Sequence, residues 1–114
     1  ETRRSRGKNF DWLILKCATA GKINKIQIDT HHFKGNYPDK CSVQAAFLNS
    51  QISSKSIVKK SKNWKLLLNK VKLHAHKKHN FNNSLMKNKK VNYIRLNIYP
   101  DGGISRIRVL GKTE

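Results

Sequence analysis

Acidic residues are scarce in this 114-residue chain: six Asp and Glu stand against 25 Lys and Arg, a formal net charge of +19. Such an excess can serve a polyanion partner, because Lys and Arg gain affinity by releasing counterions from phosphates. It can equally be a solvated, lysine-rich surface, since charge alone bears on solubility and nonspecific binding rather than on a site. Polar runs at 80–83 and 87–90 fit the second interpretation, so we do not expect a nucleic-acid partner.

Arginine is missing from the whole middle of the chain, where lysine supplies the positive charge. The guanidinium group is a planar fork that matches a carboxylate, and the ammonium group of lysine cannot imitate it. We therefore interpret the few arginines, all near the two ends of the sequence, as positions that need the fork. They are Arg3, Arg4, Arg6, Arg95, Arg106 and Arg108.

Cysteine and long apolar runs are also sparse. Cys17 and Cys41 form no C-x-x-C and no zinc-ligand spacing, and both lie in apolar, strand-like runs, so we expect buried, reduced thiols. No apolar run reaches the roughly 18 residues of a membrane span, and no signal peptide is visible. These absences favour a soluble cytoplasmic protein without membrane contact.

Alternation of polar and apolar residues predicts strands at 23–30 and 41–48. A short apolar run at 12–17 precedes them, and Thr19-Ala20-Gly21-Lys22 predicts a turn between this run and the next strand. The inward-facing side chains of the two alternating strands are expected to be Ile26, Ile28, Thr30, Cys41, Val43, Ala45 and Phe47.

The remaining middle segments are more polar. Gly35, Asn36 and Pro38 predict an irregular loop, and 49–62 and 80–90 read as polar surface loops. The apolar residues from Trp64 onward have helical spacing that passes into alternation, which predicts a short helical turn leading into a strand. No internal repeat or second domain is visible, so we expect one antiparallel β-sandwich domain over residues 1–114.

The end of the chain predicts a β-hairpin, with strands at 91–99 and 104–110 around the turn at 100–103. In this register Arg95 would face Arg108, and such a pair repels unless a carboxylate or a bound anion lies between the two. Asp29, Asp101 or a carboxylate ligand could fill that place. The polar face of the hairpin would present Arg95, Asn97, Arg106 and Arg108 together.

Four blocks of the sequence, in this order, resemble the allantoicase repeat family. The opening E-T-R-R with D-W at 11–12 is similar to the family's W-E-T-R-R…D-W, and I-D-T-H-H-F-K-G-N-Y-P at 28–38 is similar to its second block. Lys72-Leu73 with His79 and Phe81 matches the middle block. The long closing block R-L-N-I-Y-P-D-G-G-I at 95–104, continued by Arg106, Arg108 and Gly111, is the most specific.

The resemblance implies a jelly-roll, galactose-binding-like β-sandwich and hydrolysis of allantoate to ureidoglycolate and urea in purine breakdown. The sequence at 34–41 is most similar to the second of the two repeats that family members carry. The family repeat begins upstream of Glu1, so the resemblance implies that a first strand precedes this segment. It also implies a partner repeat or a homo-oligomer that completes the site.

Hydrolysis of allantoate sets three tasks, and the sequence offers candidates for each. The substrate carboxylate needs a bidentate cation, for which Arg3, Arg95 and Arg106 are candidates. Acid–base work falls to a carboxylate or imidazole. The candidates for it are Glu1, Asp29, His31 and His79, and Asn36, Asn97 and Asp101 are candidates for contacts with the ureido groups.

Each candidate also has a purely structural interpretation. Asp101 before two glycines is a common turn former, Asn36 can simply shape its loop, and Thr30 on the inward face is expected to be structural. The histidines at 74, 76 and 79 suggest a divalent metal, but Lys77 and Lys78 between them would repel a cation, so we expect no cofactor.

Two other functions remain open alongside the enzyme. The chain could be a ligand-binding sandwich that has lost turnover, or a nucleic-acid-binding module. The latter needs exposed aromatic residues among basic ones, and the aromatic residues here are expected to be in the core or in loop packing. Those residues are Trp12, Phe33, Phe47 and Trp64.

Overall fold

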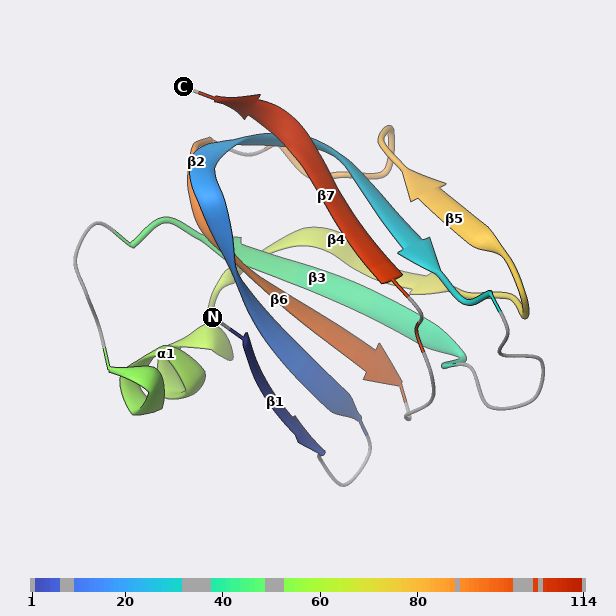
Figure 1. Cartoon of the computed structure of the whole chain (residues 1–114), viewed down its shortest axis with the longest axis horizontal. Coiled ribbons are helices and arrows are strands. Elements are labelled where there is room, and N and C mark those ends of the chain that lie inside the picture. The colour runs from blue at the N-terminus through green and yellow to red at the C-terminus, as the bar shows by residue number, and fades with distance from the viewer. Residues whose placement is uncertain are drawn as a thin grey trace.

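The computed structural model describes residues 2–6, 10–31, 38–48, 53–87, 89–99, 104 and 106–113, within which seven strands and one helix follow one another (Figure 1). All strand pairs are antiparallel, as the sequence predicts. The elements are β1 (Thr2–Arg6), β2 (Asp11–Asp29), β3 (Lys40–Ala46), α1 (Ser54–Ser61), β4 (Lys65–Lys72), β5 (Lys78–Phe81), β6 (Val91–Tyr99) and β7 (Arg106–Thr113).

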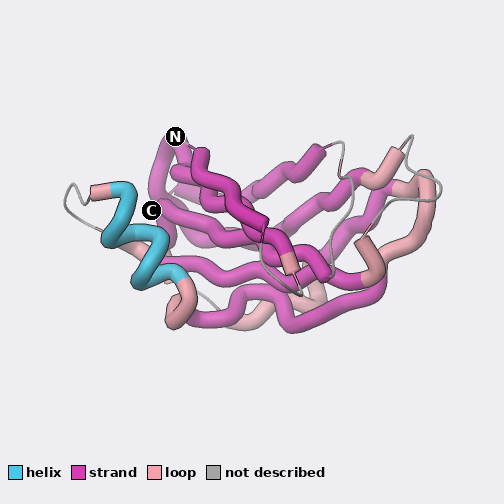
Figure 2. The backbone as a smooth tube through the Cα atoms, turned by 90° about the horizontal axis from the view of Figure 1, so that it is seen from below, coloured by secondary structure: helices cyan, strands magenta, loops and turns pink. Residues whose placement is uncertain are grey.

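β2 is long enough, at 19 residues, to belong to two layers of a sandwich (Figures 1 and 2). Its first half lies between β1 and β6 in a layer of order β1-β2-β6-β3-β4, and its second half lies between β5 and β7. The pairing with β6 shifts between Lys16 and Gly21, where the strand bends from one layer to the other. The predicted turn at 19–22 is therefore wrong, because β2 bends near Ala20 and Gly21 without ending.

The core lies between the two layers and follows the predicted alternation. Ile26 and Ile28 of the second layer and Cys41 and Val43 of the first are fully buried, and Ala45 is 8% exposed. Complete burial of each large aliphatic side chain contributes about 1.5–3 kcal/mol. Phe47 is the exception, because it lies beyond the end of β3 and is 42% exposed rather than inward.

Residues 54–61 form a helix where the sequence predicts a polar loop. The hydroxyl of Ser53 caps α1 by accepting from the Ser56 backbone N–H at 3.3 Å. Ile57 is the buried anchor of this helix, and it packs on Ile14 and Tyr93 on the outer side of the larger layer. Two adjacent apolar side chains, the buried Ile57 and the partly buried Val58, thus dock a helix whose other residues are polar, a signal too weak for periodicity to detect.

The turn predicted near Trp64 is present, since the Trp64 N–H donates to the Ser61 carbonyl at 3.2 Å, but the helical spacing that continues to Val71 belongs to the strand β4. Its pairing with β3 shifts register next to Val43, which pairs with Leu68. At this irregularity both Leu67 and Leu68 are buried, at 1% and 0% exposure. Two adjacent buried residues break the alternation of a strand and mimic the spacing of a helix.

The predicted terminal hairpin does not form. Both edges of β6 are occupied, by β2 on one side and β3 on the other, so β7 pairs with β2 in the opposite layer. Arg95 lies opposite Ile14 and Gln44, and Arg106 lies opposite Asp29. The proposed repulsion between facing arginines is therefore absent from this pairing.

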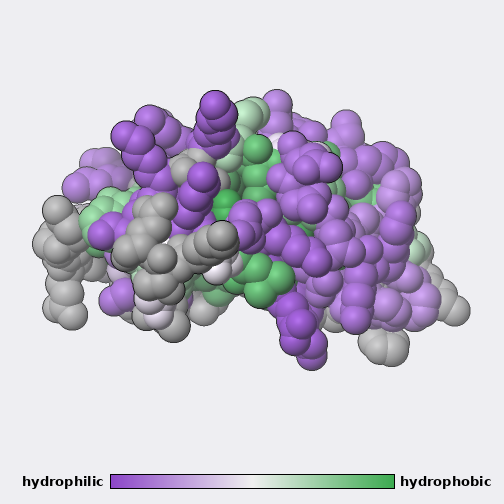
Figure 3. All heavy atoms as spheres, turned by 90° about the horizontal axis from the view of Figure 1, so that it is seen from above, coloured by the Kyte–Doolittle hydropathy of each residue, from purple (hydrophilic) through white to green (hydrophobic). Residues whose placement is uncertain are grey.

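On the face seen from above, hydrophilic residues cover most of the described part of the molecule, and a strip of hydrophobic residues shows between them (Figure 3). Both cysteines are free; Cys41 is buried, which raises its thiol pKa to about 12, and Cys17 is half-buried. No helix among the described residues is long and apolar enough to cross a bilayer.

Candidate functional site

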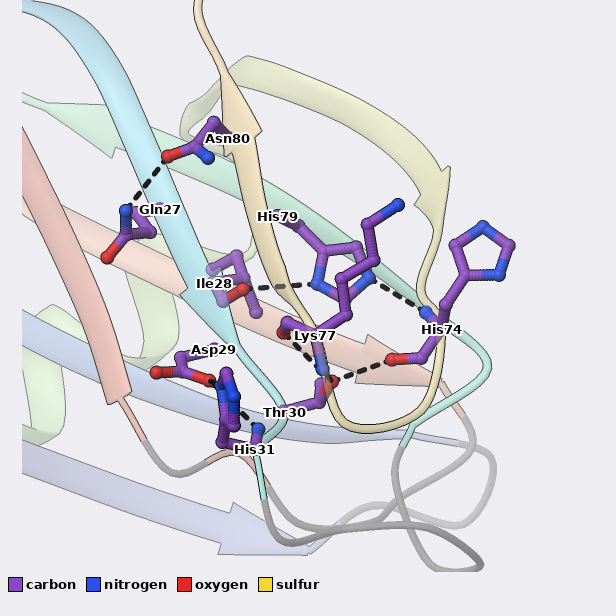
Figure 4. Close-up of polar contacts among 9 residues, drawn as sticks. All are labelled: Gln27, Ile28, Asp29, Thr30, His31, His74, Lys77, His79 and Asn80. Carbon is purple, nitrogen blue, oxygen red and sulfur yellow. Dashed lines mark hydrogen bonds and ion pairs between the residues drawn. The ribbon is translucent and has the colours of Figure 1, made fainter.

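An aspartate and a histidine form a close pair where β2 ends (Figure 4). Asp29 Oδ1 accepts a hydrogen bond from the His31 backbone N–H at 2.8 Å, and His31 Nδ1 lies 2.9 Å from the same oxygen. The side chain of Asp29 is 11% exposed and that of His31 is 40% exposed. The carboxylate therefore fixes the imidazole from the protein side, while the ring itself reaches the surface.

The pair is arranged to keep Asp29 ionised. The backbone hydrogen bond from His31 is the main cause that holds the pKa of Asp29 below its ordinary value, and the imidazole and Lys78 act in the same direction. An ionised carboxylate orients a neighbouring imidazole and stabilises its protonated form. The geometry thus holds the His31 ring in one orientation beside a carboxylate.

Arg106 stands beside this pair because β7 begins opposite the end of β2. Asp29 and Arg106 are cross-strand partners, and Gln27 and Arg108 are the next such partners on the same face. This face points away from the core, since the alternating residues Ile26 and Ile28 are fully buried. Three predicted site residues, Asp29, His31 and Arg106, are thereby brought together at one end of the sandwich.

Thr30 ties the loop between β4 and β5 to this end of β2 (Figure 4). Its hydroxyl donates to the His74 carbonyl at 2.6 Å and accepts from the Lys77 N–H at 3.1 Å, while its own backbone N–H donates to the Lys77 carbonyl at 2.9 Å. Thr30 is fully buried. It has the structural role expected from its inward position, and it fixes the segment that follows Asp29.

His79 is also buried at this end, but its ring is engaged by the backbone on both sides. Nε2 accepts from the His74 backbone N–H at 2.8 Å, so Nδ1 carries the proton and donates to the Ile28 carbonyl at 3.1 Å. Burial is the main cause that lowers its pKa, and the charges of Lys77 and His74 add to it. With both nitrogens engaged, His79 is better placed to hold β5 on β2 than to exchange protons with a substrate.

Acid should destabilise the protein through His79. A folded-state pKa below the unfolded value of about 6.5 means that the neutral ring stabilises the fold above pH 6.5, and that this stability is lost as pH falls toward the folded pKa. We expect His79→Asn to cost about 1–3 kcal/mol at pH 7.5, because the His74 N–H loses its acceptor. It should also flatten the dependence of stability on pH between 5 and 7, measured by urea unfolding.

His76→Asn is the matched control for this prediction. His76 is exposed and has a positive φ of 51°, which asparagine tolerates well, so the variant should keep the pH dependence of the parent. A parent protein whose stability does not fall below pH 6.5 would contradict the assignment. So would loss of the pH dependence in His76→Asn rather than in His79→Asn.

The histidines lie near one another without forming a group suited to a metal within the described part of the chain. The rings of His31 and His76 meet edge to face with centroids 4.5 Å apart, and those of His74 and His79 stack at 5.9 Å. These are ring contacts, and the backbone hydrogen bonds of His79 direct its nitrogens away from a shared ligand position.

Arg95 and Asn97 are not part of this cluster, which corrects the prediction that they share a face with Arg106. They alternate with core residues of β6 and so point outward from the larger layer, whereas Asp29 and Arg106 point outward from the smaller one. Arg95 is 2% exposed, and its Nε donates to Asn97 Oδ1 at 2.8 Å.

A buried serine that the sequence does not single out completes the surroundings of Arg95. One terminal nitrogen of the guanidinium donates to Ser61 Oγ at 2.7 Å, and the group lies 4.9 Å from the centre of the Trp12 ring. Burial lowers the pKa of Arg95. These contacts join the end of α1 to the sheet, and Ser61 was hidden from sequence reasoning because its segment reads as a loop.

The other predicted site residues cannot be placed in the same way. Glu1, Asn36 and Asp101 lie outside the described residues. Arg3 lies in β1 opposite Ile14, and its side chain is also outside the description.

Comparison with known proteins agrees with the sandwich and with its sequence blocks. The allantoicase repeat family matches residues 1–114. A protein named probable allantoicase 1 from Burkholderia mallei is 49% identical over 114 residues, which cover all of this chain and 34% of that protein. The chain thus spans about a third of the length of the curated relatives it matches.

Superposition on solved structures agrees with the sequence comparisons at the level of the fold. The crystal structure of allantoicase from Saccharomyces cerevisiae superposes with a TM-score of 0.72 at 31% identity, covering 96% of this chain and 30% of that one. XRCC1, solved with the catalytic domain of DNA polymerase β, gives a TM-score of 0.70 at 11% identity, covering 96% of this chain and 79% of that one, and so shares the fold alone. With the family match over its whole length, this antiparallel jelly-roll sandwich belongs to the allantoicase repeat family.

Proposed function

We propose that the protein carrying this repeat hydrolyses allantoate to ureidoglycolate and urea. The observation that supports this most is the meeting of an ionised carboxylate, a surface imidazole and an arginine at the end of β2. Allantoate carries one carboxylate and two ureido groups on a single carbon. Its hydrolysis needs a cation for the carboxylate and a proton carrier for the carbon–nitrogen bond that breaks.

Each member of the cluster has a distinct task in this proposal. Arg106 holds the substrate carboxylate with its planar donors. His31 takes a proton from the attacking water and returns one to the nitrogen of the leaving urea, and the new hydroxyl stays on the central carbon. Asp29 orients His31 and stabilises its protonated form across the 2.9 Å contact.

We further propose that a partner completes the site. Arg106 is exposed, and it lies opposite Asp29 at the end of the sandwich that carries the pair of Asp29 and His31. The curated relatives are about three times as long as this chain, so each of them contains polypeptide that can cover this end. A second repeat, or a second copy of the protein, would supply donors for the remaining ureido group and exclude water.

Urea release from allantoate tests the proposal, in the purified protein that carries this repeat. A hybrid tests the repeat itself: residues 1–114 replace the matching segment of the Burkholderia mallei relative. We expect turnover in both. Arg106→Lys should lower kcat/KM by roughly tenfold or more, because the bidentate contact is lost. Arg108 lies on the same face, in the next cross-strand pair along β7, and Arg108→Lys should leave kcat/KM within about twofold of the parent value.

A non-catalytic ligand-binding sandwich is the second candidate, favoured by the low share of carboxylates in the chain. It predicts that allantoate raises the melting temperature of the protein and of the hybrid without any release of urea. Absence of both turnover and stabilisation in a folded, assembled sample rejects binding of allantoate altogether.

A further inference from the structure

A groove of 700 Å³ lies at the end of the sandwich opposite to Asp29 and His31. Its walls come from the end of β3, the start of β4 and the segment that leads into β6, with one residue from β2. Because Val91 pairs with Gly21 at the bend of β2, whereas Tyr99 pairs with Lys40 near the other end, the groove and the candidate site are separated by the length of the strands.

Lysines ring this groove. Five of them line it, all exposed, and no acidic residue is among the residues that line it. The three acidic residues that the structure describes, Asp11, Asp29 and Asp39, all lie toward the other end of the strands: Asp11 pairs with Ile98, and the Asp39 N–H bonds to Tyr99 O at 2.9 Å. The lysines are Lys22, Lys65, Lys87, Lys89 and Lys90.

The floor of the groove is apolar and partly open to solvent. Phe47 is 42% exposed and Leu66 is 44% exposed. Lys90 Nζ lies 4.7 Å from the centre of the Phe47 ring. A cation over the ring and an aliphatic neighbour make a surface on which an apolar side chain can pack beside a negative group.

Hydrogen bonds to the backbone hold the segments that form the floor of the groove in place. Leu48 N–H donates to Asn92 Oδ1 at 2.8 Å, and Asn92 Nδ2 donates back to the Leu48 carbonyl at 2.8 Å, so the residue after Phe47 is fixed to β6. On the other side, Ala45 pairs with Lys65 and Met86 N–H donates to the Leu67 carbonyl at 2.8 Å. A ligand would therefore meet a preformed surface, which lowers the entropic cost of binding.

We propose that this groove, the lysine groove, binds an acidic amphipathic polypeptide segment of a partner. Such a segment places apolar side chains on Phe47 and Leu66 and carboxylates against the surrounding lysines. A second copy of this chain is disfavoured as the occupant, because a net charge of +19 on each copy opposes the contact.

Nucleic acid fits the groove less well than an acidic peptide. Single-stranded binding uses several aromatic platforms for successive bases, and the groove offers one aromatic ring, with a lysine already over its face. Its remaining floor is aliphatic, as in Leu66 and Val91. All five cations are lysines, so bidentate recognition of phosphate by arginine is not available among the residues that line it.

Fluorescence anisotropy with labelled probes tests this proposal in the protein that carries the repeat. The first probe is a twelve-residue peptide of alternating Glu and Leu; the second is a hexaglutamate peptide, and the third a six-nucleotide oligothymidylate. We expect the Glu-Leu peptide to bind more tightly than both other probes. Lys65→Glu with Lys89→Glu should weaken its binding by roughly tenfold or more, with strong dependence on salt.

Two further variants separate the lysine groove from general attraction to a basic protein. Lys59→Glu with Lys60→Glu makes the same change of charge on the exposed side of α1 and should alter binding by less than about threefold. Phe47→Ser should weaken the Glu-Leu peptide and leave hexaglutamate unchanged. Equal effects of the two lysine pairs, or tightest binding of the oligonucleotide, overturns the proposal, provided that circular dichroism shows all variants folded.

Discussion

Replacing Asp29 with asparagine is expected to reduce kcat for urea release by roughly 10²- to 10⁴-fold, the range seen when a positioned proton carrier loses its charged partner. The asparagine side chain can still accept from the His31 N–H, so the loop is kept. It cannot stabilise a protonated imidazole across the 2.9 Å contact with His31 Nδ1. Steady-state kinetics on the hybrid and on the parent protein measure the effect.

The same pair predicts a non-additive double variant. If Asp29 acts through His31, then Asp29→Asn combined with His31→Gln should be no slower than His31→Gln alone. Asp39→Asn is the matched control, because Asp39 is half-exposed and ion-paired with Lys72 at the same end of the sandwich. A fall in kcat with Asp39→Asn as large as that with Asp29→Asn, or strictly additive losses in the double variant, argues against the dyad.

Replacing Gly111 with alanine is expected to cost roughly 2–4 kcal/mol of stability. A Cβ atom at this position would lie 2.0 Å from the Lys22 carbonyl oxygen and 2.9 Å from its carbon. Both are backbone atoms of β2, so no side chain can rotate away. β7 must then retreat from β2 at the place where their pairing already shifts, between Ile23 and Lys25.

Urea unfolding followed by tryptophan fluorescence measures this cost. Leu110→Ala is a suitable control in the same strand, because Leu110 is 46% exposed and its loss should change stability by no more than about 0.5 kcal/mol. A Gly111→Ala protein as stable as the control contradicts the close approach of the two backbones. The requirement for glycine here comes from space and from a neighbouring strand, which the closing sequence block alone does not reveal.

The class of fold and the core faces of two strands could be predicted from the sequence, because alternation reports which side of a strand is buried. Ile26, Ile28, Cys41 and Val43 are confirmed as fully buried. Alternation does not report which strand is the neighbour. The apolar faces of β6 and β7 would point into the core in a hairpin within one layer, and they also do so when the two strands lie in two facing layers.

The candidate site shows the same limit. Asp29, His31 and Arg106 were all predicted from the sequence, and pairing of β7 with β2 brings them together. Arg95 was predicted beside them, but it is buried on the outer side of the other layer with Ser61 and Asn97. The error follows from the wrong strand pairing. In a hairpin of β6 and β7, Arg95 and Arg106 would lie on the same face of one layer, whereas in the sandwich they lie on the outer faces of different layers.

β2 has a consequence for how the protein folds and opens. Because one continuous strand is central in both layers, neither layer can separate without breaking the hydrogen bonds of a strand that the other depends on. The sandwich should therefore unfold as a single cooperative unit, with amide protons in both layers exchanging at similar rates. Most of its pairings also join residues far apart in sequence, and such a topology folds slowly, on the order of milliseconds to seconds.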